Sequence, residues 1–558
     1  MGEMNTLPEL LAYSAHRFGD SPAFQTLNEE GEIQGYTYRQ IAIGADLVAK
    51  WLAQRGVARC DHVALISENR PEWSMAYFAI HLLGAVVVPV DTRLGPDEIR
   101  DILVQSCSKT LVSSEQMGEV ARQAAAGLDG LNVVYLEQAL SERITDPAIP
   151  FPDLTLQNAA PDDIAVITFT SGATGDPKGI MLTHRNIASN ITAASQAFDC
   201  YPDDRFISLL PLSHVFEKTA GMLVPFYNGA CVTYVHSLNP RIIAEAMQKL
   251  DTTICLIVPA VARLFHKRIV TAVAESPLWR RTFYHALMAV SRAGRRRGWH
   301  VGRFFFRKLR RRFGSQMRYF VSGGAPLDPE IAEFFDCIGL PMLQGYGLSE
   351  AAPIVSTNTI LSHRLGSVGR PIPGLDVVVQ PREGCEPGAG EVLVRGPNIM
   401  AGYFQDAQAT AQVLRDGYLH TGDIGWLDDD GYLFISGRLK NVIIGESGKN
   451  VSPEEVEKAI ARSPLIKEVC VLGRRNGSRS EEVAALVVPH DELSQDKSET
   501  ELSRMIRTEL RKVCRTLADY KRPKYFALSA QEFPKTTTLK IKKPELLKQI
   551  QNYPFRPV

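Results

Sequence analysis

The chain lacks three features that would assign it at once to a class. It has no CxxC pair among its nine scattered cysteines, which argues against a disulfide scaffold or a zinc site and favours a reducing compartment. Its longest apolar runs, such as LLGAVVVPV at 82–90, are far shorter than the ~20 residues that cross a bilayer. Its beginning lacks the basic and then apolar segments of a secretory signal. We therefore expect a cytoplasmic protein.

The chain also lacks net charge, because 62 Lys and Arg residues balance 62 Asp and Glu residues. This balance argues against a uniformly basic protein that coats nucleic acid, and we expect no nucleic-acid partner. The 558 residues, 45% of them hydrophobic, are enough to bury a large core. They predict several domains, or one large domain with an appendage.

Short runs rich in Val and Ile alternate with segments of helical spacing in the first part of the chain. This alternation predicts an α/β fold with largely parallel sheets buried on both faces. From about residue 365, short strands and glycine-rich turns predict a compact β-rich subdomain, and a smaller αβ unit follows Gly437. In that unit Ser452 is the expected N-cap of a helix that begins at Pro453. The runs expected to be strands are 63–67, 86–90, 164–169, 231–235, 254–258 and 317–321.

A loop rich in Ser, Thr and Gly joins the strand IAVITF to a helical segment. The loop, TSGATGDPKG at 170–179, predicts a phosphate-binding site, because small residues let backbone N–H groups approach an anion. It is not a Walker loop, since lysine precedes glycine, and no GxGxxG is present. The alternative is a flexible surface loop. The candidate contacts are Thr170, Ser171, Gly172, Ala173, Thr174, Gly175 and Lys178.

This loop closely resembles the phosphate loop of the AMP-forming acyl-CoA synthetases, and further motifs follow in that family's order from about residue 10 to 545. The resemblance implies a large N-terminal domain of stacked αβ sheets with a β-rich subdomain, residues 1–437. It also implies a small mobile αβ domain, residues 438–558, with a hinge at its start.

The motif QGYGLSE (344–350) offers a ring to stack on adenine, hydroxyl donors and a carboxylate. Glu350 is a hard oxygen ligand suited to Mg²⁺, and the resemblance adds Thr170 as a second metal contact. The alternative is a glycine turn before a helix whose first-turn Glu favours the dipole. The nucleotide-binding candidates of this motif are Gln344, Gly345, Tyr346, Gly347 and Ser349.

The turn SGGAPL (322–327) follows a predicted strand, and the resemblance implies that Gly324, Ala325 and Pro326 line the adenine pocket. Without the resemblance, the interpretation of this turn is a structural connection between a strand and a helix.

Asp423 and Arg438 resemble the pair that holds the ribose hydroxyls. The alternative for either is an ordinary surface charge.

Lys440 occupies the family's hinge position, where the alternative is a solvated lysine. Lys540, in PKTTTLKIKK (534–543), corresponds to the lysine that neutralises charge as the acyl-adenylate forms. Composition alone does not single out Lys540, because other lysines lie nearby. Leu539 replaces the glycine that usually precedes this lysine, and it resembles the long-chain branch in this respect.

The loop at 446–455 departs from many relatives, which carry an arginine there that reaches the phosphates. Gly448 and Lys449 are the candidates in its place, and the phosphate partner from this loop stays unassigned.

The segment PLSHVFEK (211–218) resembles the long-chain signature around a histidine. His214 is therefore expected beside the acyl pocket and the CoA tunnel, with a core histidine as the alternative. The apolar run at 221–235 predicts either a tunnel wall or plain core.

Residues 279–318 hold twelve arginines, one lysine and no acidic residue. Large apolar residues are interleaved with these charges, which favours the surface of an anionic bilayer. The alternatives are affinity for CoA or nucleic acid, or a solvated basic face with its aromatics in the core.

The motifs together predict a ligase that uses ATP and Mg²⁺ to activate a long-chain fatty acid and transfers it to coenzyme A. The first alternative is a fatty acyl-AMP ligase, or a medium-chain or aromatic acid ligase, that passes the acyl group to a carrier protein or to CoA. A non-catalytic lipid- or nucleotide-binding relative is the second.

Overall fold

The computed structural model describes residues 4–28, 30–140, 144, 149–154, 159–171, 177–235, 237, 239–383, 385–444, 450–475, 481–490, 493, 497–535 and 541–558. By backbone contacts these residues form two units. The first holds the described parts of Met1–Ser171, Pro177–Asp376 and Arg395–Leu414, and the second those of Val377–Val394 and Arg415–Val558. The second unit takes in β-rich residues that the sequence interpretation placed before 438, and the boundary at 437/438 stays a prediction.

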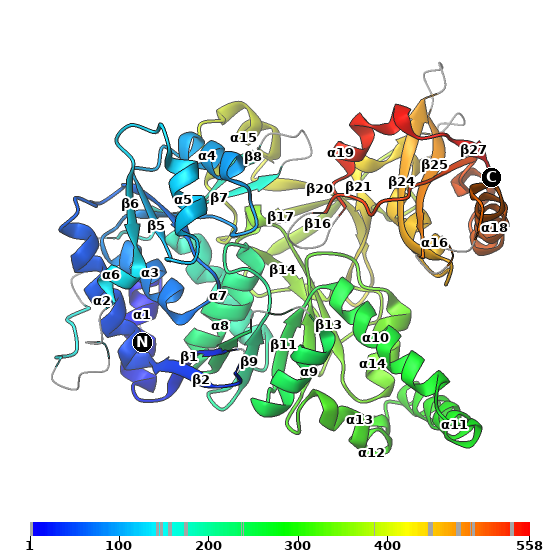
Figure 1. Ribbon diagram of the computed structural model, residues 1–558, viewed down its shortest axis with the longest axis horizontal. Coiled ribbons are helices and arrows are strands. Elements are labelled where there is room, and N and C mark those ends of the chain that lie inside the picture. Colours follow the sequence, from blue (N-terminus) through cyan, green and yellow to red (C-terminus); the bar gives the residue numbers. More distant parts are fainter. Residues whose placement is uncertain are drawn as a thin grey trace. The chain divides into compact units, whose positions relative to one another are not determined.

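The first unit contains one sheet whose centre is parallel and whose ends are antiparallel (Figure 1). Its strands, in spatial order, are β15 (Arg370–Pro371), β14 (Ile354–Thr357), β13 (Met342–Gly347), β12 (Tyr319–Ser322), β11 (Ile254–Ile257), β9 (Arg205–Ser208), β10 (Cys231–Tyr234), β1 (Pro22–Leu27) and β2 (Ile33–Thr37).

A second sheet of this unit is parallel from β7 to β6 and ends in the antiparallel strands β8 and β18. In order they are β18 (Gly402–Tyr403), β8 (Pro177–Thr183), β7 (Ile164–Ser171), β4 (Val86–Pro89), β3 (His62–Ile66), β5 (Thr110–Ser113) and β6 (Asn132–Tyr135).

Several helices of the first unit begin at a side-chain cap. Thr6, Thr37 and Thr183 each close a capping box, in which the side chain accepts the N–H of the third helical residue. The helices are α1 (Leu7–Phe18), α2 (Tyr38–Ala53), α3 (Pro71–Leu82), α4 (Pro96–Gln105), α5 (Gly118–Ala125), α6 (Leu136–Ala139), α7 (His184–Ala197), the π-helix η2 (Glu217–Leu223), α8 (Val224–Asn228), α9 (Pro240–Lys249), α10 (Pro259–Ala274), α11 (Leu278–Arg295), α12 (Gly302–Phe305), α13 (Arg307–Arg310), η3 (Arg311–Phe313), α14 (Pro329–Cys337), η4 (Ser349–Ala351) and α15 (Ala407–Val413).

Residues of the apolar run at 221–235 are buried in the core of this unit. Phe226 is fully buried and stacks on Phe24 and Tyr38, at centroid distances of 5.2 and 4.7 Å. Phe226 is therefore part of the core, and a tunnel wall formed by other residues of the run stays a prediction. Within the described ranges, no helix is both long and apolar enough to span a bilayer.

The second unit holds a mainly antiparallel β-rich sheet, a two-stranded ribbon and a further mixed sheet. The β-rich sheet has β16 (Asp376–Pro381), β17 (Gly390–Arg395), β20 (Tyr418–Leu427) and β19 (Leu414–Arg415), with β21 (Leu433–Arg438) paired to β20. The ribbon is β22 (Ile443–Ile444) and β23 (Asn450–Val451), and the mixed sheet is β24 (Ile466–Arg475), β25 (Glu481–Pro489), β26 (Tyr525–Leu528) and β27 (Arg556–Pro557). The helices are η5 (Leu439–Asn441), α16 (Pro453–Ile460), α18 (Glu499–Val513), η6 (Cys514–Thr516), η7 (Asp519–Lys521), α19 (Lys543–Lys548) and η8 (Ile550–Asn552).

The α/β prediction is confirmed, and each strand expected in the first part forms within two residues of its predicted start. Ser452 does precede α16, but its side chain makes no cap hydrogen bond. Its hydroxyl instead donates to the carbonyl oxygen of Ser436, 2.9 Å away, which joins the start of α16 to β21.

Candidate active site

The β7–β8 hairpin carries the two ends of the predicted phosphate loop. Thr170 is paired with Lys178, and Ser171 with Pro177, across this hairpin. Gly172, Ala173, Thr174 and Gly175 lie outside the described residues, so their predicted role stays a prediction. The described backbone thus holds Thr170 opposite Lys178.

A tyrosine connects this hairpin to the predicted metal ligand. β18 pairs with β8, which places Tyr403 opposite Ile180. The ammonium of Lys178 lies 4.9 Å from the centre of the Tyr403 ring, a cation–π distance. The Tyr403 hydroxyl donates a hydrogen bond of 2.9 Å to Oε1 of Glu350. Lys178, Tyr403 and Glu350 therefore form one continuous contact chain beside the hairpin.

Tyr403 was not predicted from the sequence. The available signal was the pair Gly402–Tyr403, but nothing in a single sequence pairs it with β8, more than 200 residues away. A shallow hollow beside this chain is lined by residues of the same strands, including Phe169, Lys178 and Tyr403.

The segment with Glu350 is set by close backbone packing. β13 carries Gln344 to Gly347, and η4 carries Ser349 and Glu350. A Cβ on Gly347 would lie 2.0 Å from the carbonyl oxygen of Pro353, so only glycine fits there. Tyr346 is partly buried, opposite Ser356 of β14, and Gly345 lies opposite Thr357.

The turn SGGAPL follows β12 and precedes α14. Gly324 has φ of +80°, a left-handed conformation that favours glycine. Gln344 reaches the end of the turn: in the amide orientation that satisfies both its groups, its oxygen accepts the Leu327 N–H at 3.0 Å. The structure thus joins Gln344 to the turn that holds Gly324, Ala325 and Pro326.

His214 lies on the segment between β9 and η2, and its side chain is 33% exposed. Its Nε2 is 3.3 Å from Oδ2 of the buried Asp91, which follows β4. Burial alone raises the pKa of Asp91, but the His214 imidazole and the Arg93 backbone N–H together lower it to about 2. Asp91 is therefore a carboxylate at neutral pH, facing the imidazole. The sequence analysis missed it.

Directly after this segment, the π-helix η2 buries two residues of opposite charge. Glu217 and Lys218 are both fully buried. Burial raises the pKa of Glu217 to about 8, with a smaller opposing effect of the Ser208 hydroxyl. Burial lowers the pKa of Lys218 to about 7, and its Nζ has no hydrogen-bond partner among the described residues. A π-helix of this kind is uncommon and is frequent at functional sites.

In the second unit, β20 and β21 bring the predicted ribose pair together. Asp423 lies opposite Arg438 in the strand register, and Nε of Arg438 donates to Oδ1 of Asp423 at 2.7 Å. The carboxylate is almost fully buried and the arginine more than half exposed. Lys440, two residues further in η5, is exposed.

Lys540, Gly448 and Lys449 lie outside the described residues, and their roles stay predictions. The neighbouring lysines that competed with Lys540 in the sequence are described. Lys535 pairs with Glu468 and Glu532, Lys542 with Glu545, and Lys543 with Glu457. Each is thus engaged with a carboxylate of its own unit.

The basic segment 279–318 folds as α11, α12, α13, η3 and the start of β12. Figure 1 shows α11, in green, extending beyond α10 and α14. One face of α11 packs on the core, where Arg295 pairs with Asp336 and Arg292 with Glu333 of α14. On the outer face Trp279, Phe283 and Val290 are 66, 60 and 52% exposed, spaced as one helical stripe.

The aromatics beyond α11 divide between surface and core. Trp299 and Phe304 are 64 and 81% exposed, whereas Phe306 and Phe313 are buried. The core alternative is therefore confirmed for Phe306 and Phe313, and membrane contact through the exposed aromatics stays a prediction.

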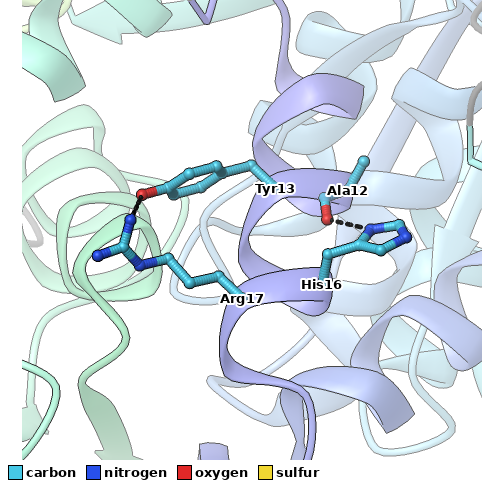
Figure 2. A pocket seen from close by; sticks show the side chains of 4 residues that line it. All are labelled: Ala12, Tyr13, His16 and Arg17. Carbon is cyan, nitrogen blue, oxygen red and sulfur yellow. Dashed lines mark hydrogen bonds between the residues drawn. The ribbon is translucent and has the colours of Figure 1, made fainter. Parts of the chain in front are cut away.

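A second surface depression lies on α1 and contains none of the predicted residues. Figure 2 shows Tyr13 and Arg17 on one side of the helix and His16 with Ala12 on the other. Arg17 donates to the Tyr13 hydroxyl at 2.9 Å, and Nδ1 of His16 lies 2.8 Å from the Ala12 carbonyl oxygen. These groups satisfy one another along a helix face, so we do not assign a site there.

Comparison with known proteins tests this assembly of motifs. The profile described as AMP-binding enzyme matches residues 11–404, and that of the AMP-binding enzyme C-terminal domain matches residues 455–540. The chain belongs to the AMP-binding enzyme family. The resemblance to AMP-forming acyl-CoA synthetases of the long-chain branch is thereby confirmed.

Relatives within this family extend over nearly the whole chain. A long-chain-fatty-acid–CoA ligase of Yersinia pestis is 30% identical over 582 residues, covering 97% of this chain and 94% of the relative. A feruloyl-CoA synthase of Streptomyces is 31% identical over 516 residues, covering 91% and 93%. The AMP-binding enzyme family thus includes relatives of this chain named for aliphatic and for aromatic acids.

Solved structures of the family share the fold. A Mycobacterium tuberculosis fatty acyl CoA synthetase superposes with a TM-score of 0.69 at 27% identity, covering 99% of both chains. ATP-bound MatB from Rhodopseudomonas palustris gives a TM-score of 0.77 at 26% identity, covering 98% of this chain and 99% of that one. The predicted architecture, a large N-terminal and a small C-terminal αβ domain, is therefore confirmed as a fold.

Proposed function

We propose that this member of the AMP-binding enzyme family is an ATP-dependent ligase that activates a long-chain fatty acid as an acyl-adenylate and transfers it to coenzyme A. The observation that carries the proposal is the contact chain from Lys178 through Tyr403 to Glu350, beside the ends of the phosphate loop. The long-chain relatives support the choice of acid.

In the first half-reaction, a carboxylate oxygen of the fatty acid attacks the α-phosphorus of ATP. The bond from that phosphorus to the bridging oxygen breaks, and pyrophosphate leaves. Lys178 and the loop at 170–175 hold the phosphates, Tyr346 and the turn at Gly324 hold the adenine, and Asp423 with Arg438 holds the ribose. The ammonium of Lys540 stabilises the negative charge that develops at the α-phosphate.

Glu350 suits the magnesium ion that accompanies ATP, because Mg²⁺ in nucleotide enzymes takes one or two carboxylates together with substrate phosphates. The described residues contain no group of three His, Cys, Asp or Glu side chains that could hold a metal by themselves. Glu350 and Thr170 would hold the metal together with the phosphates of the nucleotide. When bound, it neutralises phosphate charge.

In the second half-reaction, the thiol sulfur of CoA attacks the acyl carbon and AMP leaves as its phosphate monoester. We propose that Lys440 is the hinge of the change between the two half-reactions, and that Lys540 acts only in the first.

A Lys540→Ala variant tests this division. We expect pyrophosphate release from ATP and fatty acid to fall at least a hundredfold, because one charge-stabilising group is typically worth about 10²–10³ in rate. The same variant should still convert supplied acyl-adenylate and CoA to thioester. Loss of both half-reactions, or of neither, would refute the role of Lys540.

The acyl substrate is tested by thioester formation with acids graded from acetate to oleate, and with ferulate. A rate that rises toward oleate supports the proposal. The second candidate is an aromatic acid ligase, favoured by the feruloyl-CoA synthase relatives, and a preference for ferulate would establish it instead. Transfer to a carrier protein but not to free CoA would indicate an acyl-AMP ligase.

We also propose that the outer face of α11, with Trp299 and Phe304, binds an anionic membrane surface peripherally, on the cytoplasmic side. Exposed aromatic side chains beside many arginines suit the boundary between lipid headgroups and acyl chains. Long-chain acids partition into such membranes, so this surface would bring the enzyme to its substrate.

A further inference from the structure

The pair Asp91–His214 has no task in the reaction as described above. The buried carboxylate of Asp91 faces three groups: Oδ1 accepts the backbone N–H of Arg93 at 3.0 Å and pairs with Nε of the same arginine at 3.4 Å, and Oδ2 lies 3.3 Å from Nε2 of His214. A buried carboxylate is costly unless other groups compensate its charge. Holding it against an imidazole that is one-third exposed is the arrangement expected of a group that exchanges protons with a ligand.

The residues that follow His214 contact segments of the predicted adenylate site. Two residues further along, the Phe216 ring lies so close to Gly323 that a Cβ there would be 2.8 Å from it. On η2, the Thr219 hydroxyl donates to the carbonyl oxygen of Ala352, two residues after Glu350, at 3.3 Å. The segment that begins at His214 therefore contacts the SGGAPL turn and the backbone just beyond the QGYGLSE segment.

The segment is also held firmly on its other side. Asn69, which follows β3, donates to the Leu210 carbonyl oxygen at 2.6 Å and accepts the Leu212 N–H at 3.0 Å. The loops after β3 and β4 thus fix the backbone before His214 and, through Asp91, its ring. Such support from neighbouring residues is what a group with a geometric task requires.

We propose that His214 accepts the proton of the CoA thiol during thioester formation, and that Asp91 is the positioning residue that holds its imidazole for this step. The inference rests on the proposed function. The Asp91 carboxylate favours the tautomer with hydrogen on Nε2, which leaves the lone pair on Nδ1. The carboxylate also stabilises the imidazolium that forms, as in other acid–histidine pairs.

The step balances in atoms and charge. The thiol proton passes to Nδ1 of His214 while the sulfur forms its bond to the acyl carbon. The bond from that carbon to the AMP phosphate oxygen breaks, and its electron pair leaves on AMP. The imidazolium then returns its proton to solvent. Only the thiolate is a good nucleophile, and an unperturbed thiol such as Cys has a pKa of ~8.5, so a base is useful at neutral pH.

The test separates the two half-reactions in the full-length enzyme. In Asp91→Asn, thioester formation from acyl-adenylate and CoA should fall ten- to a hundredfold relative to acyl-adenylate formation, with the KM for CoA within twofold. Asp91→Glu should recover part of the rate. Asp97→Asn, an exposed carboxylate on the nearby α4, is the matched control and should leave both rates as they are.

Two further measurements exclude a merely structural role. In His214→Ala, added imidazole should raise the rate of thioester formation, because it replaces the missing base. Adding Asp91→Asn to His214→Ala should cost less than threefold more, since Asp91 acts through the histidine. Equal loss of both half-reactions in Asp91→Asn, or no rescue by imidazole, would overturn the proposal. A wild-type enzyme that forms no acyl-adenylate would instead overturn the proposed function.

Discussion

In most proteins charged residues are exposed and large apolar residues are buried. The segment around η2 and the surface of α11 depart from this distribution in opposite ways. In η2, Glu217 and Lys218 are charged residue types with no exposure at all. On α11, Trp279 and Phe283 are large apolar residues that are mostly exposed. Elsewhere in the described residues Val, Ile, Leu and Phe dominate the core, and buried carboxylates such as Asp91 and Asp423 have a charged partner.

The buried charges and the exposed aromatic rings each carry an energetic cost, and each cost indicates a different kind of function. Burying charge lowers stability, and such a cost is kept where chemistry needs polar groups in a dry place. Exposed aromatic rings lower solubility, so a patch of them is retained where a surface binds a partner. We therefore expect substitutions in η2 to change stability and substitutions on α11 to change binding.

Removing the buried charges should stabilise the protein, each with its own pH dependence. Lys218→Met should raise the free energy of unfolding by about 1–4 kcal/mol below pH 7. In the wild type, burial lowers the pKa of Lys218 to about 7 from an ordinary 10.5, so the unfolded state binds more protons between these values. Stability of the wild type therefore rises with pH across that window, and the gain in the variant shrinks toward pH 10.5.

Glu217→Gln should show the opposite trend. Burial raises the pKa of Glu217 to about 8 from an ordinary 4.5, so the folded state binds more protons in that window and wild-type stability falls as pH rises. The gain in the variant should be absent below pH 4.5 and complete above about 8. Urea unfolding from pH 5 to 10 measures both trends, with the exposed Lys267→Met as control. Gains that do not change with pH would contradict the burial argument.

On α11, the apolar stripe should contribute to membrane binding and not to folding. Phe283→Ser should weaken binding to vesicles of anionic phospholipid about tenfold, from the lost apolar burial. Its unfolding free energy should change by less than about 0.5 kcal/mol, as for other exposed positions. Flotation with the vesicles measures binding. Val104→Ser on α4, an exposed apolar residue elsewhere in the same unit, should leave binding unchanged. Equal binding of Phe283→Ser and wild type would remove α11 from the proposal.

The smallest effect concerns a single charge on the same helix. The Arg280 guanidinium lies 5.1 Å from the centre of the Trp279 ring on the exposed end of α11. Arg280→Gln should weaken anionic vesicle binding about fivefold, since one basic residue near such a surface contributes ~1 kcal/mol. The loss should disappear on vesicles of neutral lipid. A loss of the same size on both kinds of vesicle would mean that charge is not what Arg280 contributes.

The sequence predicted the parts of the site that are local in the chain. The loop before Lys178, the turn at Gly324 and the segment of Glu350 each carry their own signal of glycines, hydroxyls and charge within ten residues. The expected order of strand, loop and helix was incomplete, because the strand β8 that holds Lys178 lies between the loop and α7. The pairing of Asp423 with Arg438 was also predictable, because two strands joined by a short turn bring them into register.

The parts that were missed depend on contacts between distant segments. Tyr403 reaches Glu350 only because β18 pairs with β8, and Asp91 reaches His214 only because β4 ends beside the segment after β9. Neither residue stands in a pattern that differs from an ordinary core or loop position. The sequence also could not predict which aromatic residues of 279–318 are buried and which are exposed. Adjacent residues such as Phe305 and Phe306 differ in burial because of how α12 packs.

Tyr403 has a consequence for the enzyme before any nucleotide arrives. Lys178 and Glu350 carry opposite charges, and within the described residues they form no ion pair, because the tyrosine ring faces one and its hydroxyl occupies the other. The tyrosine between the two groups keeps the ammonium and the carboxylate from pairing with each other. The cation stays ready for phosphate and the carboxylate for a metal ion, so substrate binding need not first break a salt bridge.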